Sequence, residues 1–341
     1  MRVTLKDIAA EAGVSMMTVS NVINGNRARV SPRTIARVER IVAERGYVPN
    51  TSARSLAARS SRLIALLVPA AGEDDLTLSP HNVAILGHVE RELRRHDYHL
   101  ILRGVADRSE TAQAFKSWNL DGAVLLGFLD EEIDRLGADT TGRVAVVAID
   151  SYSANPLTTG VRSDDFTGTR LATEHLIGLG HRRIVFAGPA FSDVGVVRRR
   201  FDGFARAHAD AGLAVDDALV TEVTATTYDH GVELGARLRE DHPGATAVVA
   251  TADILAVGVI AGLVESGADV PGEVSVVGFD DLDVGAYVTP RLTTVAQDVR
   301  RKAAVAVEML LGAIERDEHP AAPVSLDVRL VERASTAPPP A

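Results

Sequence analysis

The sequence predicts a small all-α helix-turn-helix head joined to an α/β body of two parallel-sheet lobes. Three short helix patterns, separated by turn signals, fall within residues 1–49. From residue 62 onward, short runs of Val, Ile, Leu and Ala alternate with helical segments, as in parallel sheets covered by helices. Residues 1–60 hold 10 Lys and Arg against 4 Asp and Glu, while the remainder holds 26 against 42. Chance can produce such a difference, but a basic arm on an acidic body is typical of a protein whose arm meets a polyanion.

The composition excludes several classes of protein. The 341 residues are 46% hydrophobic and 24% charged, which is ordinary for a soluble chain of two or three domains. No apolar run is long enough to span a membrane, and the first residues lack the apolar core of a signal peptide. The absence of cysteine excludes disulfides and thiolate metal sites and fits a reducing compartment. We therefore expect a cytoplasmic protein.

Each of the three head helices has its own start signal. Thr4 with Asp7 is spaced as a capping box, Ser15 can cap a second helix, and Ser31 followed by Pro32 opens a third. Apolar residues recur at helical spacing after each signal. The first two helices are joined by a tight turn that contains glycine, so the segment reads as a helix-turn-helix unit.

The segment "NTSARSLAARSS", residues 50–61, is predicted to be a hinge or linker. It is polar, and Leu56 is its one sizeable apolar residue. A weak helix over about Thr51–Ala58 would be too short to be stable alone in water.

The body contains eight apolar runs that predict buried strands. Their Val, Ile, Leu and Ala content suits strands covered on both faces of a parallel sheet. Such folds bind ligands beyond the carboxyl ends of their strands. The runs are "LIALLVP", "YHLILRG", "GAVLLG", "VAVVAID", "RIVFAG", "ALVTEV", "TAVVAT" and "VSVVGFD".

The predicted domain boundaries follow from these patterns. Residues 1–49 form the head, 50–61 the hinge and 62–336 the two-lobed body. The final "RASTAPPPA" is rich in proline and small residues, and residues 337–341 are predicted to be a disordered tail.

The second head helix carries the pattern of a DNA-reading helix. In a helix-turn-helix, the amino-terminal end of this helix enters the major groove against the base edges. Here that end holds Met16 and Met17, with Asn21 one turn further on. Asn can pair with adenine through two hydrogen bonds, and methionine can pack on thymine methyl groups. The alternative is an ordinary helical hairpin with an exposed polar face.

Leu56 also has two interpretations. As an exposed apolar side chain in a basic segment, it can act as a wedge in the minor groove, with the hinge folding only on DNA. The alternative is a linker leucine that rests on the body.

The sequence resembles the lactose-repressor family of bacterial transcription regulators. The head and hinge motifs are "VTLKDIAAEAGVSMMTVSNVING", "VSPRTIARVERIVAERGYVPN" and "SARSLA". The body motifs are "SDDFTGTRLATEHLIGLGHRRIVFAG", "RFDGF", "VPGEVSVVGFDD" and "LTTVAQD". The resemblance covers about residues 2–335. It implies a homodimer on a near-palindromic operator. It also implies a body similar to periplasmic sugar-binding proteins, and a ligand of that body that alters DNA affinity.

The resemblance also implies roles for residues of the head. Met16, Met17, Asn21 and Leu56 would contact bases. Contacts to DNA phosphates would come from Ser15, Thr18, Ser20, Asn24, Arg29, Ser31, Thr34, Tyr47 and Asn50.

In the body, the resemblance places Asp150, Arg200 and Asp280 at the effector site. Arg200 is a forked donor and Asp280 a paired acceptor, which suits vicinal hydroxyls, although an inter-lobe salt bridge is the alternative. Asp281 could instead cap a helix. The family often has a polar residue at Leu126 and Asn-Asp where this chain has Ala252 followed by Asp253.

These observations favour a ligand-controlled DNA-binding repressor over two other classes. The ligand is expected to be a sugar or a nucleoside-like polyol. A solute-binding protein of the same body fold would need a signal peptide and no basic head. An α/β enzyme would need a phosphate-binding loop or a nucleophile motif, and none is found. We expect no enzymatic activity, no cofactor, no metal site and no membrane partner; His175 and His181 have no metal-ligand spacing.

Overall fold

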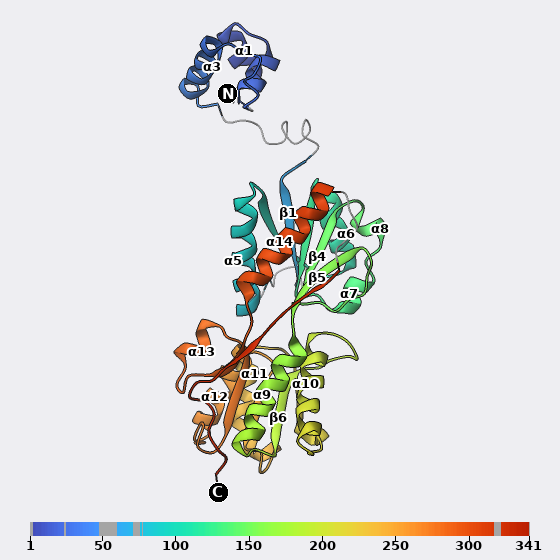
Figure 1. Ribbon diagram of the computed structural model, residues 1–341, viewed down its shortest axis with the longest axis vertical. Coiled ribbons are helices and arrows are strands. Elements are labelled where there is room, and N and C mark those ends of the chain that lie inside the picture. Colours follow the sequence, from blue (N-terminus) through green and yellow to red (C-terminus); the bar gives the residue numbers. More distant parts are fainter. Residues whose placement is uncertain are drawn as a thin grey trace. The chain divides into compact units, whose positions relative to one another are not determined.

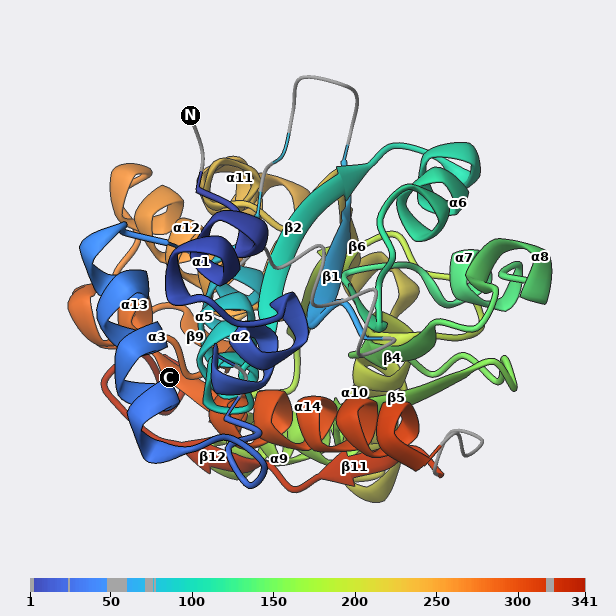
Figure 2. The ribbon, with the colours of Figure 1, turned by 90° about the horizontal axis from the view of Figure 1, so that it is seen from above.

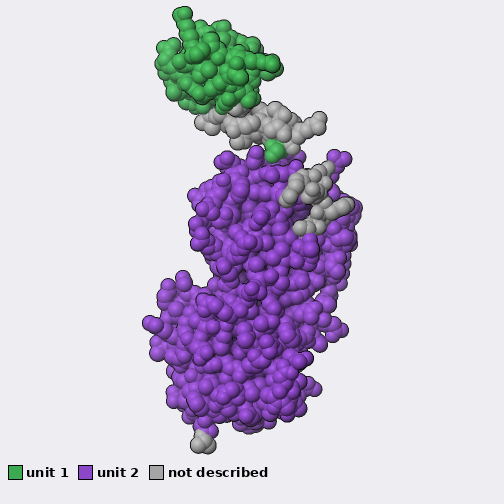
Figure 3. Space-filling model, viewed as in Figure 1, with its two compact units in different colours: residues 1–61 green, residues 62–341 purple. Residues whose placement is uncertain are grey.

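The computed structural model describes residues 3–23, 25–47, 60–70, 76, 78–316 and 322–340. The chain forms two compact units, residues 1–61 and 62–341, coloured separately in Figure 3, and each is described by itself. Figure 1 shows the helices of the first unit and the sheet-containing lobes of the second. Among the described residues, no helix has the length and apolar character needed to cross a bilayer.

The head contains α1 (Leu5–Ala12), α2 (Met16–Ile23) and α3 (Pro32–Glu44), as the start signals predict. Thr4 and Asp7 form a reciprocal capping box at α1, and Gly13 closes that helix with a φ of 61°. Hydroxyls also cap the other two helices, because Ser15 Oγ accepts from the Thr18 amide at 3.1 Å and Ser31 Oγ from the Thr34 amide at 3.2 Å. These caps satisfy amides that the first turns leave unpaired. The head core is built from Ile8, Ala9, Ala12, Val19, Val22, Val38, Ile41 and Tyr47.

The amino-terminal lobe contains a six-stranded sheet in the order β11-β5-β4-β3-β1-β2, with parallel neighbours throughout. In β1, Ile64 and Leu66 face one side of the sheet, while Ala65 and Leu67 face the other. This alternation explains why the strand is apolar throughout, because both faces are covered. The strands are β1 (Leu63–Pro69), β2 (His99–Val105), β3 (Gly122–Leu126), β4 (Ala145–Ile149), β5 (Thr158–Ser163) and β11 (Val324–Leu326).

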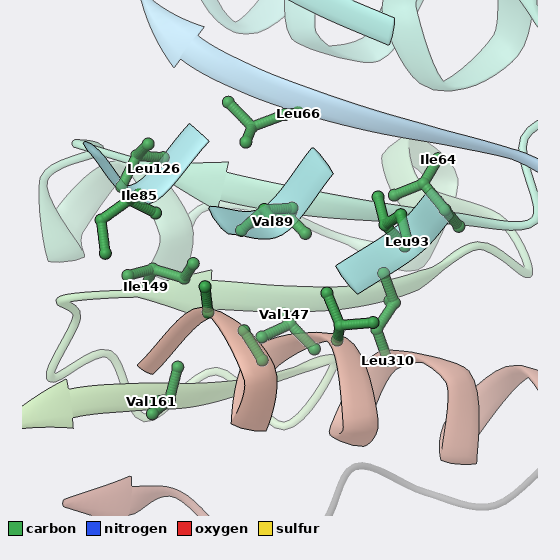
Figure 4. Packing of buried hydrophobic residues seen from close by; sticks show 14 of the residues in the cluster. Ile64, Leu66, Ile85, Val89, Leu93, Leu126, Val147, Ile149, Val161 and Leu310 are labelled. Carbon is green, nitrogen blue, oxygen red and sulfur yellow. The ribbon is translucent and has the colours of Figure 1, made fainter. Parts of the chain in front are cut away.

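Helices cover both faces of this sheet. Figure 2 shows α5 and α14 on one face and α6, α7 and α8 on the other. Figure 4 shows how the first face is filled, with Ile85 and Val89 of α5 and Leu310 of α14 packed over Val147 and Leu126. The helices are α5 (Pro80–Arg95), α6 (Arg108–Ser117), α7 (Asp130–Asp134), α8 (Ala138–Thr141) and α14 (Val299–Arg316).

The carboxyl-terminal lobe repeats this plan in the order β12-β10-β9-β8-β6-β7. Its neighbours are parallel except for β12, which is antiparallel to β10. Helices α9 and α10 pack on one face of the sheet, and α11 and α12 on the other. The strands are β6 (Ile184–Pro189), β7 (Val220–Val223), β8 (Ala247–Ala250), β9 (Ser275–Asp280), β10 (Thr293–Ala296) and β12 (Arg329–Val331). The helices are α9 (Asp165–Leu179), α10 (Val196–Asp210), the 3-10 helix η1 (Asp217–Leu219), α11 (Tyr228–Asp241), α12 (Asp253–Glu265) and α13 (Asp283–Tyr287).

The chain passes between the lobes three times: after β5, between β10 and α14, and between β11 and β12. Hydrogen bonds tie these passages to one another. Ser163 Oγ donates to Gln297 Oε1 at 2.7 Å, and the Asp164 amide donates to the Leu326 carbonyl at 2.9 Å. The two lobes are therefore joined by three neighbouring connections.

The prediction of a disordered tail is wrong for the residues that the structure describes up to 340. Ser335 is fully buried, and its hydroxyl donates to the Val276 carbonyl at 2.6 Å. The Ala337 amide donates to Ser275 Oγ at 3.0 Å, and the Ala337 carbonyl lies 2.9 Å from His181 Nε2. The segment lacks a large apolar side chain, but these hydrogen bonds fix it against β9.

Candidate functional site

The exposed methionines of α2 distinguish this helix from an ordinary packed one. Met16 and Met17 are 55% and 72% exposed, while Val19 and Val22 on the opposite side are buried in the head core. Asn21, one turn after Met17, is half-buried. The head therefore packs without its two methionines, which remain available to a partner.

The remaining head residues that were expected to touch DNA lie in different surroundings. Ser15, Arg29 and Ser31 are exposed, and Thr18, Ser20 and Thr34 are half-buried. Tyr47 is 9% exposed, with its ring in the head core, so it also has a packing role. Asn24, Asn50 and Leu56 lie outside the described residues, as does the rest of the segment 50–59.

The basic side chains of the head divide into paired and unpaired groups. Arg27, Arg40 and Arg45 form ion pairs with Glu39, Glu44 and Glu11. Within residues 3–23 and 25–47, four exposed cations make no ion pair and can meet phosphates without breaking a contact. They are Lys6, Arg29, Arg33 and Arg37.

A cavity of about 400 Å³ lies where the strand ends of the two lobes meet. Its walls come from the residues after β3 and β4 in one lobe and after β6, β8 and β9 in the other. This is the edge where parallel sheets bind ligands. Asp150, Arg200 and Asp280 all line the cavity, so the structure brings the three residues expected at the effector site together.

Asp150, directly after β4, is held by two basic side chains. Its Oδ1 accepts from Lys302 Nζ at 2.5 Å, and its Oδ2 lies 2.8 Å from His81 Nε2. Burial would raise the pKa of Asp150, but the Lys302 charge and the His81 hydrogen bond outweigh it and hold that pKa well below its usual range. Asp150 is therefore ionised, and both of its oxygens are engaged.

Arg200, the fifth residue of α10, pairs within its own lobe. Its Nε and Nη2 lie 2.9 Å and 2.8 Å from Asp165 Oδ1, and its Nη1 donates to the Thr251 carbonyl. The guanidinium also stacks over the Phe279 ring at 3.7 Å. The alternative, an inter-lobe salt bridge between Arg200 and Asp280, is not formed, because Arg200 forms its ion pair with Asp165.

Asp280 ends β9 and turns into the cavity with a φ of 134°. Its Oδ1 accepts from Gln297 Nε2 at 2.6 Å and lies 3.6 Å from His81 Nδ1. His81 thus stands between Asp150 of one lobe and Asp280 of the other. Asp281 pairs with Arg333 at 2.5 Å instead of capping α13, which begins after Leu282.

Two carboxylates near the cavity were not predicted from the sequence to belong to the effector site. Asp253, at the start of α12, is completely buried; its Oδ1 and Oδ2 accept from Thr294 Oγ1 and the Leu282 amide. Burial and the neighbouring Asp280 charge raise the pKa of Asp253 to about 7. Asp130, at the start of α7, is 7% exposed and lines the cavity. Both follow parallel strands closely, which is the signal that could have found them.

Apolar side chains form much of the remaining wall. Leu126 and Ala252, where the family often has polar residues, line the cavity beside Phe128, Phe191 and Ile254.

His175 and His181 lie away from the cavity, hydrogen-bonded to Thr336 and to Thr246, respectively. Among the described residues, no cluster of His, Asp and Glu has the arrangement of a metal site.

Comparison with known proteins places the chain in a family. Residues 4–50 match the model of bacterial regulatory proteins of the lacI family, and residues 173–336 match a periplasmic binding protein-like domain. The catabolite control protein A of Priestia megaterium is 30% identical, over 98% of this chain and 100% of that protein. The chain belongs to the LacI family of bacterial regulatory proteins. Another relative in the LacI family, the HTH-type transcriptional regulator CelR of Thermobifida fusca, is 32% identical over 98% of each chain.

Solved structures of the LacI family share the fold over the whole chain. The lac repressor dimer bound to operator and the anti-inducer ONPF has a TM-score of 0.86 and 25% identity, covering 99% of this chain and 100% of that one. A complex of the transcriptional regulator CelR with cellobiose has a TM-score of 0.73 and 29% identity, covering 98% and 100%. The head and the two-lobed body are therefore those of the LacI family.

Proposed function

We propose that this protein is a transcriptional repressor whose affinity for a near-palindromic DNA operator is controlled by a small polyhydroxylated ligand. The observation that carries the proposal is the exposed end of α2, where Met16 and Met17 face solvent above a complete head core. An exposed helix end of this kind suits the major groove. Relatives named as repressors, and the lac repressor solved on its operator, support the same role.

The proposed contacts are those expected from the sequence. Met16, Met17 and Asn21 read bases, and the hydroxyl and cationic side chains of the head hold phosphates. Residues 1–49 act as the head, 50–61 as the hinge and 62–336 as the body, with Leu56 of the hinge in the minor groove. The protein acts as a homodimer, since a two-fold operator needs two heads.

The ligand is proposed to be a sugar or a nucleoside-like polyol in the cavity between the lobes. Solved relatives hold cellobiose and ribose, which makes carbohydrates the first class to test. Asp150 and Asp280 belong to opposite lobes, so a ligand that reaches both favours one lobe arrangement. DNA affinity changes only when the ligand binds the two arrangements unequally.

An electrophoretic shift assay with the DNA upstream of the protein's own coding region tests the proposal. Retention of that DNA by the full chain at low nanomolar concentration is expected, with weaker retention of a scrambled duplex. A carbohydrate that raises the thermal midpoint should also change the retained fraction. Equal retention of both duplexes would contradict the proposed role.

Substitution of Arg200 tests whether the cavity between the lobes binds the effector. Arg200→Ala would leave Asp165 buried without its cation, so a folding defect would obscure the result. Arg200→Lys keeps the charge and loses the planar fork. We expect the affinity for the effector to fall about 10-fold or more, since a hydrogen bond to a charge contributes about 1.5–3 kcal/mol. Operator binding without ligand should persist, and calorimetry with parallel shift assays measures both.

A further inference from the structure

The two fixed cations near the cavity are already neutralised by carboxylates. Arg200 directs two of its nitrogens to Asp165 and a third to the Thr251 carbonyl. Lys302, fully buried, lies 2.5 Å from both Asp150 Oδ1 and Gln297 Oε1. Neither cation therefore has an unpaired positive charge that could bind an anionic ligand.

Asp130 presents a carboxylate oxygen that lacks a partner. Its Oδ1 accepts from Ser151 Oγ at 2.5 Å and from the Tyr152 and Ser153 amides at 2.8 Å and 3.1 Å. Its Oδ2 is buried and accepts no hydrogen bond from any described residue. A Cβ placed on Gly195, at the start of α10 in the other lobe, would lie 3.5 Å from that oxygen. The unpaired oxygen therefore faces the space between the lobes.

Asp280 contributes a second carboxylate, which feels the charge of Arg200 together with Asp165 but forms no close ion pair with a fixed cation. Its Oδ1 takes the Gln297 amide, which is neutral, and no described residue donates to its Oδ2. His81 is the nearest basic side chain, with Nδ1 3.6 Å from Asp280 Oδ1, and its Nε2 is already engaged with Asp150. Among the described residues that line the cavity, the carboxylates of Asp130, Glu131, Asp150 and Asp280 outnumber one fixed cation, Arg200.

We infer that the cavity takes a neutral or cationic polyhydroxylated ligand and rejects anionic ones such as sugar phosphates and sugar acids. The inference deepens the proposed function, on which it rests. Ligand hydroxyls or an ammonium group would supply donors to Asp130 Oδ2 and Asp280 Oδ2, while Phe128 and Phe191 cover the apolar faces of the ring. A phosphate or carboxylate would lose its water beside unpaired negative charge.

The test compares matched forms of one carbohydrate on the full chain. Neutral, amino, phosphorylated and acid forms are used for glucose, galactose and mannose. Ribose is compared with ribose 5-phosphate, and cellobiose is added as a neutral disaccharide. Thermal shift ranks the compounds and calorimetry measures those that bind. We expect the tightest compound to be neutral or amino, with its phosphorylated or acid form weaker by about 100-fold or more.

A tighter phosphorylated or acid form would overturn the inference and leave the proposed carbohydrate control intact. Absence of binding by every compound would instead count against the carbohydrate effector itself, and the inference would fall with it. The two failures are therefore distinguishable.

A second test needs no ligand. Asp130→Asn and Asp280→Asn keep the Oδ1 acceptor and remove an unpaired negative charge, so both should raise the thermal midpoint of the ligand-free protein. Asp165→Asn is the matched control, because it removes a carboxylate that pairs with Arg200 and should lower the midpoint. Loss of thermal stability in all three variants would show that the cavity carboxylates are compensated, which contradicts the inference.

Discussion

Asp150 and Asp280 adopt positive φ values, 57° and 134°, at the positions where their side chains enter the cavity. Such conformations cost about 1–3 kcal/mol each for residues other than glycine, and they persist where the surroundings hold them in place. Here Lys302 and His81 hold the first carboxylate and Gln297 the second. Each lobe thus contributes one strained aspartate to the proposed effector site.

Asn21 tests the proposed reading of bases. Because a paired Asn–adenine contact contributes about 1–3 kcal/mol of discrimination, Asn21→Ala should relax preference at one symmetric pair of operator positions. Affinities for a set of single-base operator variants measure this. An equal loss of affinity on every duplex would show that the residue contacts phosphate alone.

Asp253 should make the free energy of unfolding decrease as the pH rises toward neutrality. Its pKa in the folded protein is raised to about 7, above the value in the unfolded chain, so the folded state binds the proton more tightly. Stability therefore falls as the pH rises from about 4 to about 7. Asp253→Asn removes this loss, so its free energy of unfolding relative to wild type should rise by about 1 kcal/mol or more between pH 5 and 8.

Urea denaturation at several pH values between 5 and 8 measures the effect of Asp253→Asn. Asp150→Asn is the control without pH dependence: because the pKa of Asp150 is held low, its charge stabilises the folded state equally across this pH range, so the variant should be less stable than wild type by a constant amount. Parallel stability curves for Asp253→Asn and wild type would contradict the raised pKa.

The residues around the cavity were predictable only in part. Asp150, Arg200 and Asp280 could be placed because they match family motifs at the ends of apolar runs. His81 and Lys302 could not, because each lies on a helix far along the chain from the carboxylate it contacts. Their role depends on how the two lobes bring distant segments together, which local sequence does not encode.

At the scale of elements, glycine allows α11 and α12 to pack at very short range. A Cβ on Gly258 of α12 would lie 2.1 Å from the Tyr228 carbonyl oxygen, and one on Gly231 of α11 would lie 2.3 Å from the Leu255 carbonyl oxygen. The two backbones are thus in direct contact, as glycine alone permits.

Gly258→Ala should therefore be strongly destabilising. Because backbone atoms cannot yield as a flexible side chain can, we expect a loss of about 2 kcal/mol or more in the free energy of unfolding. Gly178→Ala is the matched control in α9, where a Cβ meets nothing within 4 Å. That variant should be neutral or more stable by up to about 1 kcal/mol. Denaturant unfolding measures both, and similar values for the two would contradict the close packing.

The eight apolar runs all correspond to strands, so the two parallel sheets could be predicted. In the part of the chain that the structure describes, four further strands were missed. β5 carries Thr, Arg and Ser, β10 is four residues long, and β11 and β12 are only three residues each. Such segments become strands because a neighbouring strand offers hydrogen bonds, so their own composition is a weak signal.

At the scale of the whole molecule, we expect a dimer and nothing larger. A two-fold operator needs two heads, so one dimer is sufficient to occupy it. Light scattering should give twice the chain mass of 36.1 kDa for the protein alone, and that mass plus one duplex when operator DNA is added. A mass four times that of the chain would contradict this expectation.

The three neighbouring connections between the lobes limit how the two lobes of the body can move relative to each other. One connection would leave the lobes free to twist, slide and bend, whereas three side by side leave bending as the soft motion. We therefore expect one variable, the angle between the lobes, to describe the state of the body. Under the proposed function, chemically different ligands that hold the same angle would produce the same change in DNA affinity. What the protein senses would thus be the geometry that a ligand imposes, whichever atoms impose it.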